Sequence, residues 1–90
     1  MSTSDFLLLM HAGPQTDPKA WGPYLQRLRE TGRMQGGSSI GAGAPPAVTE
    51  QLSGYIKVRA ADLADAQTLL VGQPVDEAGG VVEIRHLPTD

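Results

Sequence analysis

Four segments of the chain have the hydrophobic pattern of β-strands. The first contains a continuous apolar run from Phe6 to Met10, which is too short for a helix and is typical of a strand buried on both faces. The second is weakened by two adjacent glycines, and the last two alternate apolar with polar side chains. The predicted strands cover residues 5–11, 34–40, 54–59 and 81–87.

Two further segments carry apolar residues at three- and four-residue spacing, which predicts amphipathic helices. Asp17-Pro18 marks the start of the first helix, because an aspartate can accept hydrogen bonds from the free amides and a proline loses no needed donor there. Thr31-Gly32 ends this helix. Asp62 begins the second helix, Gly72 closes it, and Pro74 prevents it from resuming. The apolar stripes consist of Ala20, Trp21, Tyr24, Leu25 and Leu28 in the first helix and of Leu63, Ala66, Leu69 and Leu70 in the second.

The predicted elements follow the order β-α-β-β-α-β, which is typical of ferredoxin-like α+β domains. Right-handed crossovers place both helices on one face of a four-stranded antiparallel sheet. The expected strand order is 4-1-3-2, which makes the first strand central and agrees with its unbroken apolar run. Residues 1–90 are expected to form one domain, with a flexible loop over the Gly-, Ala- and Pro-rich residues 41–53 and a second loop over residues 76–80.

One face of this sheet has no helix to cover it. Along the first strand, Phe6, Leu8 and Met10 point one way and Leu7 and Leu9 the other, so one of these sets faces away from the helices. Large apolar side chains left in water forfeit about 1.5–3 kcal/mol each.

A chain of 90 residues without cysteine also has a thin core and no disulfides. These observations predict a homodimer in which two sheets pack face to face; in the alternative, the 41–53 loop covers the open face of a monomer. Four charged residues are expected to ring the apolar patch or pair across it: Lys57, Arg59, Glu83 and Arg85.

The charge balance limits the classes of partner. Lys and Arg number 7 against 10 Asp and Glu, which gives a net charge of −3. No affinity for nucleic acid or for an anionic membrane is therefore expected. No segment approaches the roughly 20 apolar residues of a membrane span, and residues 1–10 lack the positive start of a signal peptide. The resulting predictions are a cytoplasmic location and no cofactor.

A set of short motifs runs nearly from end to end of the chain. They are Phe6–Met10, Trp21-x-x-Tyr24-Leu25-x-x-Leu28, Gly32-Arg33-Met34-x-Gly36-Gly37, Leu52–Ile56, Asp62-Leu63-x-x-Ala66, Gln73-Pro74 and Gly80–Arg85. In this order and spacing the chain resembles the YCII-related proteins, including the branch known for a DGPF motif. The resemblance implies a ferredoxin-like fold that forms a dimeric α/β barrel.

The same resemblance bears on the site. Some family members look like lyases that act on small aromatic or ring compounds through a His–Asp dyad. The His lies on the first helix and the Asp precedes a proline after the second. Tyr24 and Gln73 stand at those positions here, and Pro45–Glu50 stands in the region of the DGPF motif. The resemblance thus points to Tyr24 and Gln73 as site positions, with neither dyad residue present.

His11 is the candidate general base. It lies at the end of the first strand beside a loop, where a neutral imidazole can accept a proton near pH 7. In the alternative, a backbone carbonyl satisfies this histidine. His86 lies toward the other end of the neighbouring strand, about 15 Å away at the rise of a β-strand. The two histidines therefore do not predict a metal site within one subunit.

Trp21 and Tyr24 lie on the apolar stripe of the first helix. They are either core residues or the wall of a groove between this helix and the sheet, where a small ring compound could stack and receive a hydrogen bond from the Tyr24 hydroxyl. Gly36 and Gly37 either let backbone amides approach an anion or serve a bulged strand. No Gly-Lys-Ser/Thr follows them, so they are not a phosphate-binding loop.

The leading hypothesis is a dimeric protein with a small-molecule groove and a weak lyase or isomerase activity on a small organic compound. His11 would be the base and Tyr24 the hydrogen-bond donor. The predicted binding residues are Trp21, Gly36, Gly37 and Gln73. The alternative is a non-catalytic module that binds a metabolite or docks on a protein.

Overall fold

The computed structural model describes residues 3–41, 43 and 52–88. The strands are β1 (Ser4–His11), β2 (Met34–Ser39), β3 (Leu52–Ala60) and β4 (Val82–Leu87), and the helices are α1 (Pro18–Glu30), α2 (Leu63–Thr68) and α3 (Pro74–Glu77). None of the helices within these residues is long and apolar enough to cross a membrane.

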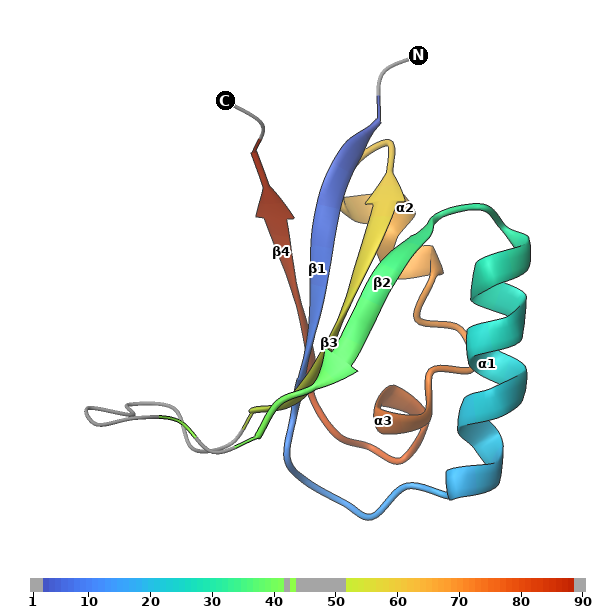
Figure 1. Ribbon diagram of the computed structural model, residues 1–90, viewed down its shortest axis with the longest axis vertical. Coiled ribbons are helices and arrows are strands. Elements are labelled where there is room, and N and C mark those ends of the chain that lie inside the picture. The colour runs from blue at the N-terminus through green and yellow to red at the C-terminus, as the bar shows by residue number, and fades with distance from the viewer. Residues whose placement is uncertain (1–2, 42, 44–51, 89–90) are drawn as a thin grey trace.

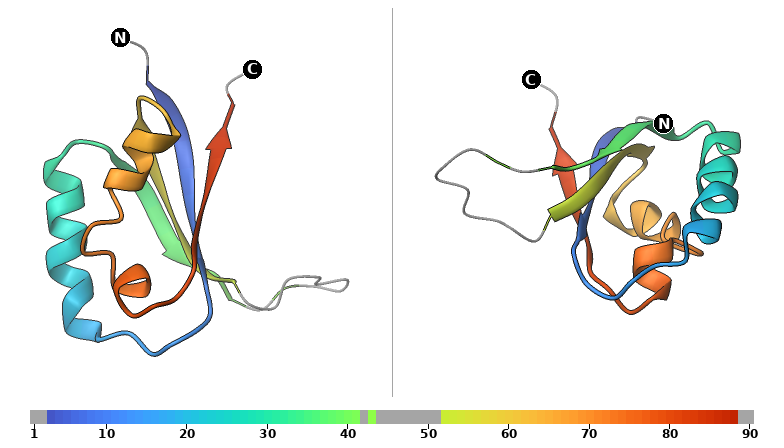
Figure 2. Two further views of the ribbon diagram at one scale, coloured as in Figure 1. Left: turned by 180° about the vertical axis from the view of Figure 1, so that it is seen from behind. Right: turned by 60° about the horizontal axis from the view of Figure 1, so that its bottom comes forward.

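The four strands form one antiparallel sheet in the order β2-β3-β1-β4 (Figure 1). Figure 2 shows that the helices lie on the same side of this sheet and leave its other face without a helix. The predicted α+β class, the ferredoxin-like topology and the central place of β1 are therefore confirmed. β1 is central because both of its edges are hydrogen-bonded, one to β3 and the other to β4.

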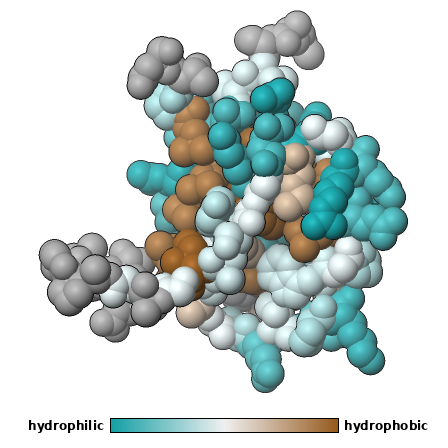
Figure 3. All heavy atoms as spheres, viewed as in Figure 1, coloured by the Kyte–Doolittle hydropathy of each residue, from teal (hydrophilic) through white to brown (hydrophobic). Residues whose placement is uncertain are grey.

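The register of the sheet decides which side chains form the core. Leu8 pairs with Ile56 of β3 and with Ile84 of β4, and Leu8 is fully buried beneath the helices. The odd-numbered residues of β1 point the other way, and Leu7 and Leu9 remain partly exposed. Figure 3 shows hydrophobic surface along the strands, on the side of the molecule opposite α1, with hydrophilic residues beside it. The set that faces away from the helices is thus Leu7 and Leu9.

The register also places the four charged residues predicted around this patch. Leu7 pairs with Lys57 and with Arg85, and Leu9 pairs with Glu83. Paired residues of an antiparallel sheet lie on the same face. Lys57 and Arg59 each form an ion pair with Asp5, at 3.8 and 3.7 Å. The open face is therefore an apolar centre with charged side chains around it.

The helix boundaries follow from the capping residues. The Asp17 carboxylate accepts a hydrogen bond from the Lys19 amide at 2.9 Å, and the Asp62 carboxylate accepts one from the Asp65 amide at 2.8 Å. Each cap satisfies a free amide of the first helical turn. Past the C-terminus of α1, Gly32 has a φ of 73°, which a side chain would strain. Both predicted helix starts and the stop at residues 31–32 are confirmed.

The structure corrects three expectations. The predicted loop at residues 76–80 does not begin at Asp76, because Asp76 and Glu77 lie in α3, which starts at Pro74 and is capped by Gln73. Leu63 does not lie in the core, since 54% of it is exposed. Leu52 and Ser53, which were assigned to the 41–53 loop, begin β3. Residues 42 and 44–51 of that loop lie outside the described part of the chain, as does the proposed DGPF region.

The two adjacent glycines of β2 have distinct structural roles. Gly36 has a φ of 142° and lies where the β2–β3 register shifts, which is the bulge predicted for this strand. A Cβ on Gly37 would lie 2.6 Å from the Tyr55 carbonyl oxygen and 3.2 Å from the Ile56 Cα. Both glycines are therefore required by the backbone of the sheet.

Candidate functional site

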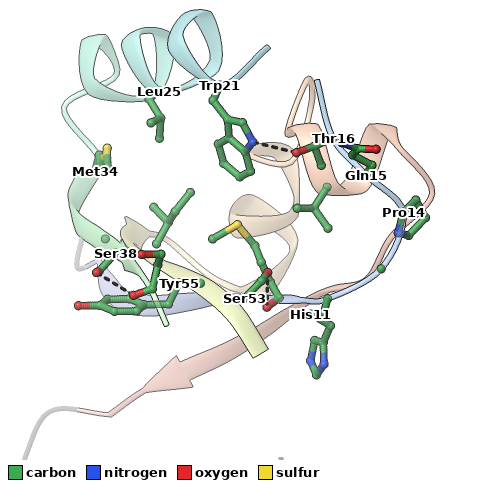
Figure 4. Close-up of a pocket in the computed structure, with 18 of the residues that line it drawn as sticks. His11, Pro14, Gln15, Thr16, Trp21, Leu25, Met34, Ser38, Ser53 and Tyr55 are labelled. Atoms are coloured by element: carbon green, nitrogen blue, oxygen red, sulfur yellow. Dashed lines mark hydrogen bonds between the residues drawn. The ribbon is translucent and has the colours of Figure 1, made fainter. Parts of the chain in front are cut away.

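A cavity of about 620 Å³ lies between α1 and the sheet. It falls in the range of pockets that hold small molecules, about 300–1,000 Å³. One wall is α1, through Trp21, Leu25 and Arg29; another is the loop at residues 12–16; the floor comes from β1, β2 and β3. Figure 4 shows the side chains of Trp21 and Leu25 directed from the helix toward the strands. The groove expected beside the first helix is therefore a cavity of ligand size.

Trp21 is the largest apolar side chain of the cavity wall. Its indole N–H donates a hydrogen bond to the Thr16 hydroxyl oxygen at 3.2 Å (Figure 4). Its ring also meets the Tyr24 ring edge-on, with centroids 6.4 Å apart and an angle of 79° between the planes. Such edge-to-face pairs are a preferred aromatic geometry. These two contacts hold the indole in place, and Trp21 packs partly against the core while lining the cavity.

Besides His11, the remaining polar groups of the cavity are hydroxyls, amides and one guanidinium. Thr16 and Gln15 line it from the loop, Ser53 lines it from β3, and Arg29 lines it from the last turn of α1. None of the described lining residues is an aspartate or a glutamate. Met34 and Ile56 complete an apolar floor. The cavity can therefore bury a ring while hydrogen-bonding its substituents.

Tyr24 lies outside this cavity and belongs to the core. It is 3% exposed, and its hydroxyl donates a hydrogen bond to the Leu69 carbonyl oxygen at 2.7 Å. Burial raises the pKa of this phenol to about 12, an effect that the nearby Arg27 opposes. The only hydrogen of this hydroxyl is therefore used in a bond to the backbone at the end of α2. A smaller cavity of about 150 Å³ borders Tyr24 on this side, together with Arg27 and Leu28.

Gln73 is fully buried and is not among the residues that line the large cavity. Its side-chain oxygen accepts hydrogen bonds from the Val75 amide at 2.6 Å and the Asp76 amide at 3.0 Å, which caps α3. Its side-chain nitrogen has no hydrogen-bond partner within the described residues. Gln73 therefore positions α3, whose Val75 reaches the cavity.

His11 borders the cavity at the end of β1, but its imidazole is directed away from Trp21 and Leu25 (Figure 4). Its Nε2 lies 3.1 Å from Glu83 Oε1. A carboxylate only accepts hydrogen bonds, so Nε2 carries the hydrogen in this pair. Arg85 Nη1 lies 3.4 Å from the other Glu83 oxygen. These three side chains form a charged cluster on the open face of the sheet.

The structure thus separates the residues proposed from sequence. Trp21 and Gly37 meet at the cavity, whereas Gly36, Tyr24 and Gln73 do not line it. His11 and the Tyr24 hydroxyl are not brought together. His86 packs against Phe6 on the helix side, with ring centroids 5.2 Å apart, and so lies on the opposite face from His11.

The side chains of the cavity that sequence reasoning missed include Thr16, Arg29 and Met34. One signal was present for Arg29. Trp21, Leu25 and Arg29 are spaced four residues apart, and residues at this spacing lie along one side of a helix. Thr16 and Met34 carry no comparable pattern, because only the tertiary fold brings them to α1.

The fold and the cavity define a small α+β protein with a ferredoxin-like sheet and an apolar ligand-sized site beside its first helix. The chain belongs to the YCII-related domain family, whose model matches residues 8–88. The resemblance inferred from the sequence motifs is confirmed. A search of curated proteins found no match to this chain.

A solved structure with a similar fold is 5-chloro-2-hydroxyhydroquinone dehydrochlorinase from Burkholderia phenoliruptrix, in complex with 2,5-dihydroxybenzoquinone. The two chains are 14% identical, and the TM-score is 0.61. The match covers 96% of this chain and 95% of that chain. At this identity the likeness establishes a shared fold over nearly the whole length of both proteins.

Proposed function

We propose that this protein binds a small, monocyclic organic compound in the cavity between α1 and the sheet. The observation that carries the proposal is the cavity itself, a space of about 620 Å³ with an indole and aliphatic side chains on its walls. A ring that stacks on Trp21 would bury apolar area on both partners. The Thr16 hydroxyl, which accepts from Trp21, can still donate to a polar substituent of the ring, and the Ser53 hydroxyl, which donates to the Met10 carbonyl oxygen, can still accept from one.

The solved structure of similar fold supports this class of ligand. The name of that protein describes a substituted hydroquinone as its substrate, and its structure holds 2,5-dihydroxybenzoquinone. Both compounds are single rings with polar substituents, which is the shape that this cavity would admit. For the present chain we therefore propose only the class of ligand, which is a small ring compound with polar substituents.

The working form of the protein in this proposal is a homodimer. Leu7 and Leu9 form a partly exposed apolar centre on a sheet face that no helix covers. A second copy packed on this face would remove that surface from water and would offer charged partners for Lys57 and Glu83. Pairing of like faces about a two-fold axis is the commonest form of association between identical chains.

The test of the binding proposal uses the single tryptophan of the chain. Its indole N–H gives one signal in a proton–nitrogen NMR spectrum. The probes are 2,5-dihydroxybenzoquinone and a series of monosubstituted phenols, titrated into labelled protein. We expect the indole signal and the amides of Gly37 and Gly54, which also line the cavity, to shift with one common Kd.

A pair of matched variants provides the control. Leu25→Phe places a larger side chain in the cavity wall and should weaken binding by about tenfold or more, because a lost contact of about 1.4 kcal/mol corresponds to a factor of ten. Leu63→Phe makes the same change on an exposed residue of α2 and should leave the Kd unchanged. If the probes shift only amides of the open sheet face, or if both variants bind alike, the proposal is wrong.

A catalytic form of the proposal keeps His11 as the general base of a lyase or isomerase, with Glu83 orienting its ring. The His11–Glu83 pair at 3.1 Å favours this form. The direction of the imidazole, away from Trp21, favours the non-catalytic alternative, because a base must reach the proton that it removes. The hydrogen bond from Tyr24 to Leu69 supports a structural role for that hydroxyl.

These two forms predict different results for His11→Gln. In the catalytic form, turnover of a bound probe should fall by about 10²–10⁴-fold, the usual contribution of a general base, while the Kd of the probe stays the same. In the binding form, no probe is turned over by either protein. Turnover that survives the substitution would exclude His11 as the base.

A further inference from the structure

The charge of the cavity lining differs from that of the whole chain. The chain carries 10 acidic and 7 basic residues. Of the described residues that line the cavity, none is acidic and only Arg29 carries a permanent charge. An Arg guanidinium keeps its proton at every physiological pH. The cavity therefore presents a fixed positive charge with no carboxylate on its described walls to neutralise it.

The guanidinium of Arg29 has no hydrogen bond or ion pair with another described residue, and the side chain is exposed at the end of α1. Arg27, two residues earlier, provides a contrast, since its guanidinium donates to the Val71 carbonyl oxygen at 3.3 Å. Arg33, just beyond the helix, pairs with Asp65 at 3.0 Å. Of these three arginines, the one that reaches the cavity is the one whose donors remain available to a ligand.

The geometry of α1 orders the groups along the cavity. Trp21, Leu25 and Arg29 follow one another at four-residue spacing, so they lie along one side of the helix. A rise of about 1.5 Å per residue separates the first and the last by about 12 Å along the axis. An aromatic surface, an aliphatic surface and a cation therefore succeed one another along the wall. A ligand that matches this order has a ring at one end and an anion at the other.

We infer that the preferred ligand of this cavity is a small aromatic carboxylate, with its ring against Trp21 and Leu25 and its carboxylate on Arg29. The planar guanidinium fork matches a carboxylate and can donate two parallel hydrogen bonds to it. A cationic ligand would be repelled by Arg29 and would find no acidic partner among the described lining residues. This inference rests on the proposed binding function and names the specificity-determining residue of the same site.

The experiment compares acids with their neutral amides of the same shape. The probes are benzoate with benzamide and phenylacetate with phenylacetamide, titrated at pH 7 while the Trp21 indole signal is followed by NMR. The variant is Arg29→Gln, which keeps a polar side chain but removes the charge. The control is Lys19→Gln, which removes one positive charge from an exposed position on the same helix outside the cavity lining.

The wild-type protein should bind at least one acid about tenfold more tightly than its amide, since a charge-assisted hydrogen bond on a partly solvated group is worth about one such factor. Arg29→Gln should bring the two affinities to within about twofold by weakening the acid alone, and Lys19→Gln should keep the preference. In 0.5 M NaCl the wild-type preference should shrink, because the guanidinium is exposed.

The possible failures are distinguishable. If acids and amides shift the Trp21 signal with equal affinity, or if Arg29→Gln keeps the preference, the carboxylate inference is overturned while binding in the cavity stands. If neither member of either pair perturbs the Trp21, Gly37 or Gly54 signals, and the phenols and the quinone also fail to do so, the binding function is overturned together with the inference.

Discussion

The hydroxyl of Tyr24 on α1 donates a hydrogen bond of 2.7 Å to the backbone carbonyl of Leu69, the residue that caps α2. This contact links two helices that are far apart in the sequence. The resemblance to the YCII-related proteins implied a site position at Tyr24, and in this chain that side chain packs in the core. The hydrogen bond to Leu69 fixes the Tyr24 ring, and the indole of Trp21 packs edge-on against that ring at the cavity wall.

Tyr24→Phe should therefore lower the free energy of unfolding by about 1–2 kcal/mol, because the partly buried Leu69 carbonyl loses its side-chain donor. The fold should persist, since the ring and its contact with Trp21 remain. Urea denaturation followed by circular dichroism measures the change. Tyr55→Phe is the matched control, because no hydrogen bond to the Tyr55 hydroxyl is found within the described residues, and it should change stability little. Equal effects of the two substitutions would contradict this role of Tyr24.

Two glycines should respond in opposite directions to the same substitution. Gly37→Ala should destabilise the protein by about 1–3 kcal/mol, because the new methyl group would meet the Tyr55 carbonyl oxygen and force the backbone to shift. Gly22→Ala should stabilise it by about 0.5–1 kcal/mol, since nothing lies within 4 Å and a helical alanine costs less chain entropy than a glycine. Thermal unfolding of both variants tests the pair. Stabilisation by Gly37→Ala would show that β2 has room that the structure lacks.

Asp65 provides a pH-dependent contribution to stability. The Ala61 amide donates to one carboxylate oxygen at 2.9 Å and Arg33 to the other at 3.0 Å, and together they hold the pKa below the ordinary value of 3.8. A lowered folded-state pKa means that this stabilisation is complete above the unfolded-state pKa and disappears as the pH falls through the folded-state pKa. Asp65→Asn should therefore be less stable than the wild type at pH 7.

That difference should close as the pH falls through the folded-state pKa of Asp65, which lies below 3.8, because the wild-type carboxyl is then protonated as well. Urea denaturation of both proteins between pH 7 and pH 2.5 measures the gap. In an Arg33→Gln background the gap at pH 7 should be smaller, with the Ala61 hydrogen bond accounting for the remainder. A gap of constant size across this pH range would disprove the assignment.

The open sheet face predicts the behaviour of Leu9→Glu. Leu9 is half-buried in the described chain and pairs across the sheet with Tyr55 and Glu83. A second carboxylate beside Glu83 would repel it and would remove apolar surface from the proposed interface. We expect the dimer dissociation constant to rise by at least about tenfold, since each buried leucine is worth about 1.5–3 kcal/mol.

Sedimentation velocity at protein concentrations between about 1 and 100 µM would measure this change in the dimer dissociation constant. Leu63→Glu introduces the same charge on an exposed residue of α2 and should leave the association unchanged. A wild-type protein that sediments as a monomer throughout would rule out the proposed dimer.

Local chemistry accounts for the part of the fold that sequence could predict. The apolar run of β1 indicated a central strand, and Asp17 and Asp62 indicated helix starts, because each signal acts through neighbouring residues. The helix α3 was not predicted, since a glutamine is an uncommon N-cap and Pro74 was interpreted as a stop rather than a first helical residue. Leu63 matched the apolar stripe of α2 although its side chain lies beyond the edge of the core.

The site could be predicted less well than the fold. The position of Trp21 follows from the stripe of α1, but the same stripe includes Tyr24, and only the packing of Leu69 decides that Tyr24 is structural. The direction of His11 depends on the alternation of β1 and therefore on which face the helices cover. The Gln73 side chain could be assigned to α3 only after that helix was known.

The placement of β1 has a consequence for synthesis. This strand leaves the ribosome before its two partners, residues 52–60 and 82–87, so the sheet cannot close until β4 has emerged. Contacts between distant segments form slowly, and an apolar stretch without its partners is prone to aggregate. β1 is thus the segment that general chaperones would shield until β4 has been synthesised.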